Sequence, residues 1–378
     1  MNVPKLRFKE FNDEWQNYKV EEILKISNGI NKEKEFFGSG SPIINYMDVN
    51  KNELISHNIV KGLVTANSKE LETFNVKKGD ILFTRTSETS DEIGLSSSVI
   101  ENIDKCIFSG FILKGTQTKQ FIHPYFGGYY FRNPKMRKEI IKHSSITTRA
   151  LTSGSLLSQM SISIPTIIEQ GKIGKTLSLL DKKIELQTKK IEDLKLFKKG
   201  LSNNIFNNLK DFEEYKLGDL CNITTGKLDA NAMVENGKYR FYTCAKEYSF
   251  IDEYSFDTEA LLISGNGAYV GYIHYYNGKF NAYQRTYVLD QFSQNIQFIK
   301  CYLDENLSRR IKSEKKEGNT PYIVLSTLSD MIIKVPSKEN QKNISNIINY
   351  HQKKILLEEN KLQKLQELKK GLMQNMFV

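Results

Sequence analysis

The residues 157–173, LSQMSISIPTIIEQGKI, and the residues 328–344, LSDMIIKVPSKENQKNI, are two versions of one pattern at an offset of 171 residues. The match continues without a gap to Phe206 in the first copy and to Phe377 in the second. From Pro165 and Pro336 onward, 15 of the 42 aligned positions are identical. Such self-similarity indicates an internal duplication, which constrains the architecture before any local feature does.

A second match lies near the start of each copy. YKVEEILKISNG at residues 18–29 aligns with YKLGDLCNITTG at residues 215–226, at an offset of 197, so the first copy carries 26 extra residues between its two matched ends. Each copy is therefore a globular part followed by a helix of roughly 40 residues. The predicted divisions are a first domain at 1–166, a central helix at 167–208, a second domain at 209–337 and a C-terminal helix at 338–378.

Both tails have the heptad pattern of helices that pair, because apolar residues recur at spacings of three and four. The predicted seam consists of Ile173, Leu177, Leu180, Ile184, Ile191, Leu194, Leu201 and Ile205 in the first tail, and Ile344, Ile348, Ile355, Leu362, Leu365, Leu372 and Met376 in the second. A narrow apolar stripe on a charged helix needs a partner, and the other copy is the obvious one. Polar residues interrupt both seams at equivalent places, Gln187 with Glu358 and Lys198 with Lys369, which helps to fix the register.

Connectivity predicts the orientation of the two helices. A helix of about 38 residues is about 57 Å long, and it leads from the first domain to the second. The link from Phe206 to Tyr215 is short, so the second helix must run back along the first. The predicted fold class is α+β: two globular α/β domains separated by two long antiparallel coiled-coil helices, internally duplicated about a pseudo-two-fold axis.

Composition favours a chain that is soluble and binds a polyanion. The net charge is +10 and the sequence pI is about 9.1, which favours nucleic acid as a partner. No apolar run approaches the roughly 18 residues of a membrane span, and the charged start, MNVPKLRFKEFNDEW, has no export signal. We expect a cytoplasmic protein that does not bind a membrane.

Signatures of catalysis and metal binding are missing from the sequence. The chain contains no Pro-Pro, which an adenine methyltransferase loop requires, no Pro-Asp of a common nuclease motif, no HExxH and no CxxC. EQGKIGKT at residues 169–176 imitates a phosphate-binding loop but has Glu169 where that loop requires glycine, so a helix is predicted there. The sequence therefore predicts a protein that is not an enzyme and that has no metal or cofactor of its own.

The doubled layout resembles a known family. The segments SISIPTIIEQ and IIKVPSKENQ, the L-x-x-L-D-x-x-I run from Leu177 to Ile184 and the KKGL-x-x-x-x-F ends are similar to those of specificity subunits of type I restriction-modification systems. One departure is His351, which stands where the first copy has Leu180. The resemblance covers nearly the whole chain.

The resemblance implies a function and a set of partners. The globular parts would be target-recognition domains for double-stranded DNA. N6-adenine methyltransferase subunits, two per chain, would bind the helices and would themselves bind S-adenosylmethionine. ATP-dependent restriction and translocase subunits would then join. Because two diverged domains related by a two-fold axis face two half-sites, the predicted target is bipartite and asymmetric. Two alternatives stay open: a stand-alone bipartite DNA-binding regulator, and a duplicated protein-interaction scaffold without DNA binding.

Candidate DNA-contacting residues follow two equivalent predicted strands. Arg side chains suit guanine edges, Asn and Gln suit adenine edges, and Gly permits close backbone approach, while Lys and Arg in loops suit phosphates. Ser109 and Gly110 are taken as the approximate counterparts of Gln284 and Arg285. The predicted contacts are Thr84, Arg85, Thr86, Ser87, Ser109, Gly110 and Arg149 in the first domain, and Ser264, Gly265, Asn266, Gly267, Gln284, Arg285, Lys315 and Lys316 in the second.

Overall fold

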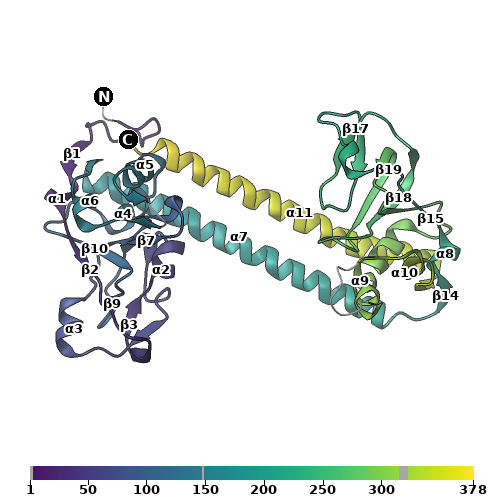
Figure 1. Cartoon of the computed structure of the whole chain (residues 1–378), viewed down its shortest axis with the longest axis horizontal. Coiled ribbons are helices and arrows are strands. Elements are labelled where there is room, and N and C mark those ends of the chain that lie inside the picture. The colour runs from purple at the N-terminus through teal and green to yellow at the C-terminus, as the bar shows by residue number, and fades with distance from the viewer. Residues whose placement is uncertain (1–2, 147–148, 315–321) are drawn as a thin grey trace. The chain divides into compact units, whose positions relative to one another are not determined.

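The computed structural model describes residues 3–146, 149–314 and 322–378. It divides into two compact units, unit 1 with Met1–Thr188 and Lys361–Val378, and unit 2 with Lys189–Asn360. Each unit contains a globular part and a section of both long helices, α7 (Ile167–Asn207) and α11 (Lys338–Asn375) (Figure 1).

The globular part of unit 1 is built on a five-stranded sheet of order β2-β10-β6-β8-β4. Smaller sheets have the orders β5-β3-β9, β11-β12-β7 and β1-β13. In chain order its elements are β1 (Gln16–Lys19), α1 (Val20–Ile23), β2 (Leu24–Asn28), η1 (Lys34–Phe36), β3 (Phe37–Ile44), α2 (Tyr46–Lys51), β4 (Leu54–Ile55), β5 (Gly62–Val64), α3 (Ser68–Thr73), β6 (Ile81–Thr84), β7 (Thr86–Ser87), η2 (Ser90–Glu92), β8 (Ser96–Val99), β9 (Ile107–Phe108), β10 (Ile112–Gln117), α4 (Pro124–Tyr130), α5 (Pro134–Lys142), β11 (Ser145–Ile146), β12 (Ala150–Leu151), α6 (Gly154–Ser158) and β13 (Ser161–Ile164).

The globular part of unit 2 is built on a six-stranded sheet of order β15-β20-β18-β19-β16-β17, with β14 and β21 paired separately. Its elements are β14 (Phe212–Lys216), α8 (Leu217–Leu220), β15 (Asn222–Thr225), η3 (Ala230–Ala232), β16 (Tyr239–Tyr242), β17 (Ser249–Ile251), β18 (Phe256–Ser264), β19 (Ile273–Ala282), β20 (Thr286–Asp290), α9 (Ile296–Glu314), α10 (Leu325–Ser329) and β21 (Ile332–Pro336).

The duplication holds at the level of strand register. Tyr18 pairs with Ile162 between β1 and β13, and Tyr215 pairs with Ile333 between β14 and β21, so both sequence offsets describe one equivalent pairing. The order β2-β10-β6 in unit 1 corresponds to β15-β20-β18 in unit 2. Between β2 and β6, unit 1 has η1, β3, α2, β4, β5 and α3, whereas unit 2 has η3, β16 and β17 between β15 and β18.

The long helices run antiparallel within each unit. In unit 2, Lys190 Nζ lies 3.0 Å from Glu358 Oε1, whereas Lys198 Nζ lies 2.7 Å from Gln352 Oε1, so rising numbers on α7 meet falling numbers on α11. In unit 1, Leu177 near the start of α7 shares a core with Met376 at the end of α11. Every predicted seam residue is buried or half-buried. The predicted α+β class with an internal duplication and antiparallel long helices is confirmed.

A buried glutamine joins each long helix to its globular part. Gln170 accepts a hydrogen bond from His123 N, at 2.9 Å, and donates to Pro165 O, at 2.9 Å. Gln341 accepts from Asn295 N, at 3.0 Å, and donates to Pro336 O, at 2.9 Å. Because an unpaired buried amide is costly, this bonding explains the Pro-x-x-x-x-Gln spacing in both copies. The segment 169–176 lies within α7, as predicted.

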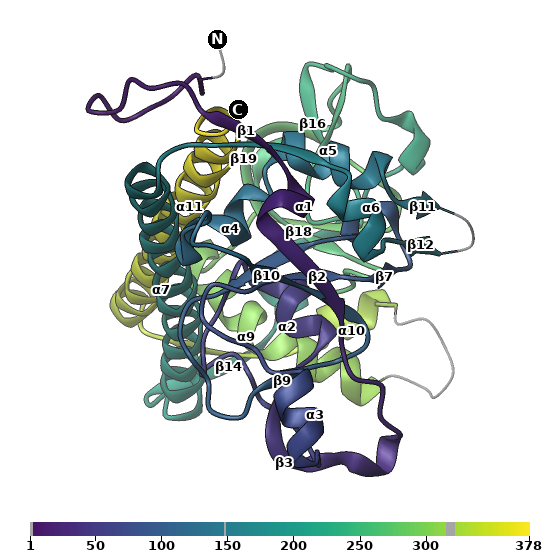
Figure 2. The ribbon, with the colours of Figure 1, turned by 90° about the vertical axis from the view of Figure 1, so that its left-hand side faces the viewer.

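The aromatic end of each tail closes the core of a unit. Phe377 packs against Phe126 and Tyr130 in unit 1, with ring centroids 5.6 and 6.0 Å apart. Phe206 packs in the same way against Phe298 and Tyr302 in unit 2, at 6.0 and 5.3 Å. Residues near the N-terminus also meet the end of α11 in unit 1, where Leu6 N donates to Asn375 O, at 2.8 Å (Figure 2). Unit 1 therefore needs both ends of the chain.

Two features are absent from the residues that the structure describes. No helix there has the length and apolar character needed to cross a bilayer. Within the same ranges, no group of three or more His, Cys, Asp or Glu side chains is placed to hold a metal ion.

Candidate nucleic-acid interface

Three chain segments meet at the end of strand β6 in unit 1. Arg85 N donates to Phe111 O, at 2.9 Å, which joins the segment after β6 to the turn before β10. Thr152 N donates to Arg85 O, at 3.0 Å, and β7 pairs with β12 next to this bond. Backbone hydrogen bonds therefore fix a surface formed by residues that are distant in sequence. We call it recognition surface 1.

Unit 2 repeats this arrangement at the end of β18. Gly265 N donates to Arg285 O, at 2.9 Å, and Ile323 N donates to Gly265 O, at 2.7 Å. Asn266 forms an isolated bridge with Tyr322, where unit 1 has the β7–β12 pair. We call this recognition surface 2. The prediction that the two candidate loops follow equivalent strands is confirmed, because β6 pairs with β10 as β18 pairs with β20.

The approximate alignment of the turns needs a correction by one residue. Arg85 bonds to Phe111 as Gly265 bonds to Arg285, so the counterpart of Arg285 is Phe111 and that of Gln284 is Gly110. Ser109 corresponds to Tyr283, because each forms a bridge to the equivalent neighbouring segment. The sequence could not set this register, since the turns share no identical residue.

Recognition surface 1 has a hollow of about 630 Å³. It brings together the predicted contacts Thr86, Ser87 and Arg149, and it adds Tyr46 and Phe111, which the sequence did not single out. The remaining lining residues are Glu88, Thr89 and Glu92. The hollow therefore combines aromatic, hydroxyl and carboxylate groups with one arginine.

Several predicted contacts lie beneath the surface, which corrects their proposed role. Thr84 and Ser264 are 0% exposed, and Ser87 and Ser109 are also buried. The Thr84 hydroxyl donates to Glu92 O and accepts from Leu95 N, both at 2.9 Å, so it shapes the segment after β6. Thr84, Ser109 and Ser264 are therefore not placed to contact a base edge, whereas Ser87 is buried but still lines the hollow of surface 1. They could not be separated from surface residues because burial depends on the tertiary fold.

The glycines Gly110 and Gly265 are buried as well. A Cβ on Gly110 would lie 1.8 Å from Asn31 Oδ1, and one on Gly265 would lie 2.3 Å from Arg285 O. At Gly265 the close atom belongs to the backbone, so close packing inside the protein requires glycine there, whereas at Gly110 it belongs to the side chain of Asn31. Both glycines pack inside the protein and are not placed to approach DNA. Gly267 is different, because it is half-buried with a φ of +80° and open space around it.

The remaining predicted contacts reach solvent. Arg85, Thr86 and Asn266 are half-buried, whereas Arg149, Gln284 and Arg285 are exposed. Arg85 Nη1 lies 3.5 Å from Gly110 O, and Gln284 Nε2 lies 3.5 Å from Asp229 Oδ2, and both contacts are long enough to yield to a ligand. Lys315 and Lys316 lie outside the described residues.

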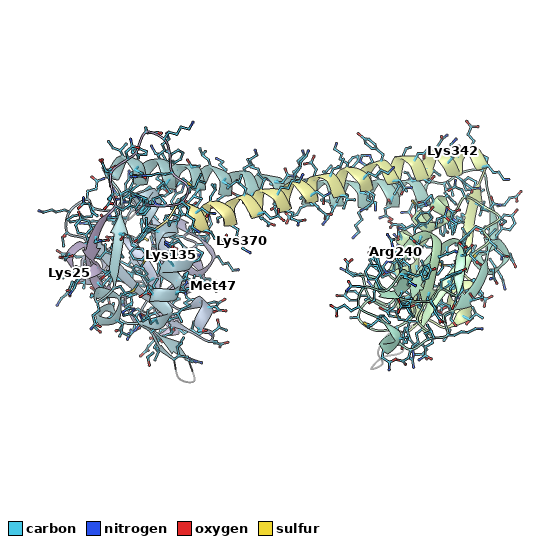
Figure 3. The ribbon with its side chains drawn as sticks, turned by 90° about the horizontal axis from the view of Figure 1, so that it is seen from above. Lys25, Met47, Lys135, Arg240, Lys342 and Lys370 are labelled. Atoms are coloured by element: carbon cyan, nitrogen blue, oxygen red, sulfur yellow. The ribbon has the colours of Figure 1, made fainter. Side chains whose placement is uncertain are left out.

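Unit 2 also carries tyrosines and cations that were not predicted as contacts. The Lys246 ammonium lies 5.3 Å from the Tyr269 ring. The Arg240 guanidinium lies 4.3 Å from the Tyr248 ring and 4.4 Å from the Tyr276 ring, and Figure 3 marks its place in the unit. Such cation–π pairs hold the half-buried Arg240 and the exposed Lys246 against aromatic rings. The signal that could have found them is the tyrosine-rich run GAYVGYIHYY at residues 267–276.

His274 lies beside these tyrosines, with ring centroids 5.0 Å from Tyr242 and 4.8 Å from Tyr272. Burial lowers the pKa of His274, although its Nε2 lies 2.9 Å from Ala245 O. The imidazole is therefore neutral at pH 7 and adds no positive charge to the surface.

Comparison with sequence families gives two matches along the chain. A family model described as the type I restriction modification DNA specificity domain matches residues 12–196 and residues 209–367. The type I restriction enzyme EcoDI specificity subunit of Escherichia coli is 39% identical over 135 residues, which are 36% of this chain and 30% of that protein. The putative type I restriction enzyme MjaX specificity subunit of Methanocaldococcus jannaschii is 26% identical over 231 residues, which are 58% of this chain and 52% of that protein. The chain thus spans about a third of the first of these two relatives and about half of the second.

Comparison with solved structures shows the same fold along the chain. The crystal structure of a type I restriction-modification system S subunit from M. genitalium superposes with a TM-score of 0.69 at 18% identity, covering 100% of this chain and 99% of that chain. A chain from a study of complex assembly in the type I R-M system superposes with a TM-score of 0.59 at 14% identity, covering 95% and 96%.

Proposed function

The chain belongs to the family of type I restriction-modification DNA specificity proteins, and on that premise we propose that it is the subunit that reads an asymmetric bipartite DNA target. It would not catalyse a reaction itself. N6-adenine methyltransferase subunits would dock on its long helices and bind the methyl donor S-adenosylmethionine. ATP-dependent restriction and translocase subunits would join that assembly.

The observation that carries the proposal is the repetition of one surface with different side chains. Both recognition surfaces are held by equivalent backbone hydrogen bonds, at Arg85 in unit 1 and at Gly265 in unit 2. Surface 1 carries Thr86, Phe111 and Arg149. Surface 2 carries Asn266, Arg285 and Tyr322 at or near the corresponding places. Because base edges are distinguished by the chemistry of the contacting side chain, the two half-sites are expected to differ in sequence.

Docking of partners is supported by exposed apolar residues that recur on both long helices. On α7, Leu179, Leu186 and Phe197 are 70%, 58% and 55% exposed. Their counterparts on α11 at an offset of 171 are Tyr350, Leu357 and Leu368, which are 63%, 61% and 51% exposed. The spacings of 7 and 11 residues keep each set on one helix face. We call these six residues the docking stripe.

The docking stripe divides evenly between the two units. Unit 1 contains Leu179 and Leu186 of α7 with Leu368 of α11, and unit 2 contains Tyr350 and Leu357 of α11 with Phe197 of α7. Exposed apolar groups at equivalent places in a duplicated chain favour two equivalent binding sites for one kind of partner. This supports two methyltransferase subunits per chain.

Methylation mapping tests DNA recognition. The chain is co-expressed with its cognate methyltransferase subunit in a host that lacks adenine methylation, and methylated adenines are located by single-molecule sequencing. We expect methylation in one motif with two different half-sites separated by a fixed number of unspecified bases. Methylation at contiguous or scattered sites contradicts the proposal. Sequence-specific DNA binding without any methyltransferase complex would favour a stand-alone regulator instead, and partner binding without DNA binding would favour a scaffold.

Native mass spectrometry of the co-expressed complex tests partner docking. The variant Leu179→Asp/Leu186→Asp is expected to bind one methyltransferase subunit in place of two, and so is Tyr350→Asp/Leu357→Asp, whereas combining all four changes leaves none. Leu196→Asp is the matched control, because Leu196 is 71% exposed on α7 but its counterpart is Glu367, outside the docking stripe. Unchanged stoichiometry in the double variants contradicts docking on this stripe.

A further inference from the structure

One four-residue turn in recognition surface 1 is held at each residue by a backbone hydrogen bond. It comprises residues 109–112, between β9 and β10, and we call it the recognition turn of unit 1. Four bonds of 2.7 to 3.1 Å hold it: Ser109 N to Ile44 O, Gly110 N to Ile30 O, Ile112 N to Ser109 O, and Arg85 N to Phe111 O. A turn bonded at each of its residues is preorganised to present whatever side chain points away from it.

The same four bonds recur in unit 2, in the recognition turn formed by residues 283–286. They measure 2.8 to 2.9 Å: Tyr283 N to Tyr242 O, Gln284 N to Leu228 O, Thr286 N to Tyr283 O, and Gly265 N to Arg285 O. The backbone of the turn is therefore the same in both units although no residue in it is identical. The side chains that reach solvent from this shared backbone therefore differ between the two units.

The third residue of each turn is exposed. Phe111 is 63% exposed, as much as any large hydrophobic side chain of unit 1's globular part. Its counterpart Arg285 is also exposed, and no carboxylate forms an ion pair with it within the described ranges. An aromatic ring that a fixed backbone keeps in water does not gain the favourable free energy of burial. Contact with a ligand would supply it.

We propose that the third residue of the recognition turn is the specificity-determining residue of each half-site: Phe111 contacts the C5-methyl group of a thymine, and Arg285 donates two hydrogen bonds to O6 and N7 of a guanine. The inference rests on the proposed function and assigns base chemistry to it. Duplex DNA offers a large apolar group only at thymine in the major groove, and guanine offers two acceptors there.

The surroundings of Phe111 favour the apolar contact. The ring lines the hollow of surface 1 together with Tyr46, and the carboxylate residues Glu88 and Glu92 line the same hollow. Carboxylates repel the phosphates and the acceptor-rich edge of guanine, so this hollow does not suit a guanine contact. Around Arg285 the neighbouring groups are the amides of Gln284 and Asn266 and the hydroxyl of Tyr322. The carboxylate of Asp229 lies 3.5 Å from Gln284 Nε2, and no ion pair joins it to Arg285.

Atomic substitution in the DNA, combined with variants, tests the inference. The methyltransferase complex is first used to define the motif, and methylation rates are then measured on duplexes carrying uracil for each thymine of one half-site, or 7-deazaguanine for each guanine of the other. Wild type should lose about tenfold in rate at one thymine and at one guanine, the scale of a good base contact. Phe111→Ala should become indifferent to uracil at that thymine, and Arg285→Ala should become indifferent to 7-deazaguanine at that guanine.

Each variant carries an internal control, because the half-site read by the other unit should keep its full discrimination. Phe111→Leu, which keeps an apolar contact, should retain most of the thymine preference, and Phe37→Ala, another exposed phenylalanine of unit 1, should leave the motif unchanged. Absence of a bipartite motif in wild type defeats the proposed function. A bipartite wild-type motif with undiminished discrimination in Phe111→Ala and Arg285→Ala, or an equal loss at both half-sites, defeats the inference alone.

Discussion

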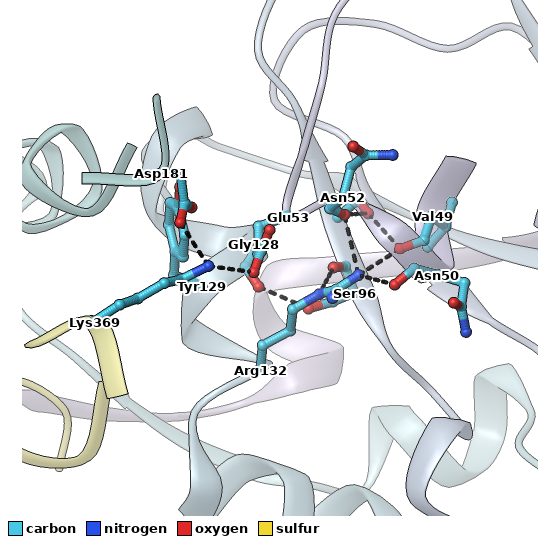
Figure 4. Close-up of polar contacts among 11 residues, drawn as sticks. Val49, Asn50, Asn52, Glu53, Ser96, Gly128, Tyr129, Arg132, Asp181 and Lys369 are labelled. Carbon is cyan, nitrogen blue, oxygen red and sulfur yellow. Dashed lines mark hydrogen bonds and ion pairs between the residues drawn. The ribbon is translucent and has the colours of Figure 1, made fainter. Parts of the chain in front are cut away.

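Lys369 and Lys198 stand at equivalent places in the two tails, yet their surroundings differ. In unit 1, Lys369 Nζ lies 2.8 Å from Glu53 Oε1 and 2.7 Å from Asp181 Oδ1, and the Tyr129 hydroxyl donates to Asp181 Oδ2, at 2.6 Å (Figure 4). In unit 2, Lys198 Nζ lies 2.7 Å from the amide oxygen of Gln352, the counterpart of Asp181. We call the unit 1 cluster the lysine latch.

The comparison extends to the space around each lysine. Beside Lys198 lies a groove of about 840 Å³, which Cys301 and Gln352 also line. Burial raises the pKa of the Cys301 thiol to about 11, so it is uncharged at pH 7. In unit 1 the corresponding helix carries Tyr129, whose hydroxyl joins the latch. At this position, ion pairs fill the space beside the lysine in unit 1, whereas a groove lies beside the lysine in unit 2.

This difference between the two lysines shows which contacts the two copies share and which they do not. Both units retain the aromatic closure by Phe377 or Phe206 and the buried glutamine, because these form the core. The latch needs Glu53, which lies in the stretch between β2 and β6 where unit 2 has unrelated elements. The ion pairs of the lysine latch could therefore differ between the two units without loss of the shared fold.

Removal of the phenylalanine ring at the end of each tail is expected to lower the free energy of unfolding more than any other change, and by a similar amount in both units. Phe377→Ala should destabilise unit 1, and Phe206→Ala should destabilise unit 2, each by about 3 to 5 kcal/mol, because each deletes a buried ring from a core. Hydrogen exchange with mass spectrometry measures this unit by unit. Phe197→Ala, at an exposed ring of α7, is the control and should change either unit by less than about 0.5 kcal/mol. Faster exchange in the globular part that precedes the mutated tail in sequence would contradict the assignment.

Replacing the latch lysine should lower the stability of unit 1 more than the equivalent change lowers the stability of unit 2. Lys369→Met removes the cation that faces two carboxylates and should destabilise unit 1 by about 3 kcal/mol, since it leaves partly buried carboxylates with only Arg132 to offset their charge. Lys198→Met removes a single contact to an amide and should cost unit 2 less than about 1 kcal/mol. Denaturant dependence of local hydrogen exchange compares the two. Equal effects would show that the latch adds nothing to unit 1 beyond the apolar packing of the lysine stem.

The features that could be predicted from the sequence are those that its internal repeat signals. The duplication and the antiparallel helices follow from repeated letters and from the shortness of the link after Phe206. The equivalence of β6 with β18 is predicted from a similar pattern, an apolar strand that leads into a polar loop. The latch could not be predicted, because Glu53 and Lys369 are 316 residues apart and only the tertiary fold brings them together. For the same reason the burial of Thr84 and Ser264, and the exposure of Phe111, appear only in three dimensions.

The smallest expected difference between the two units is the pH dependence of the stability that the lysine latch gives to unit 1. Burial opposes ionisation of Glu53, but Lys369 and Arg132 outweigh it, so the pKa of Glu53 is lowered from 4.5. A lowered carboxyl pKa gives stability that is present above pH 4.5 and is lost as the pH falls through the folded-state value. Burial raises the pKa of Asp181 despite Lys369 and Tyr129, so protonation of Asp181 in acid favours the folded state and partly offsets that loss.

Glu53→Gln should therefore flatten the acid side of the stability profile of unit 1 and leave that of unit 2 unchanged. The expected change is a smaller loss of stability as the pH falls below 4.5, because the glutamine amide does not titrate. Thermal unfolding followed unit by unit with hydrogen exchange at each pH measures it, and Glu339→Gln at an exposed position of α11 is the control. At the alkaline end burial opposes the charge of Lys369, but Glu53 and Asp181 outweigh it and its pKa is raised. The lysine contribution should therefore persist beyond pH 10.5, and its loss near neutral pH would mean that the three groups do not act together.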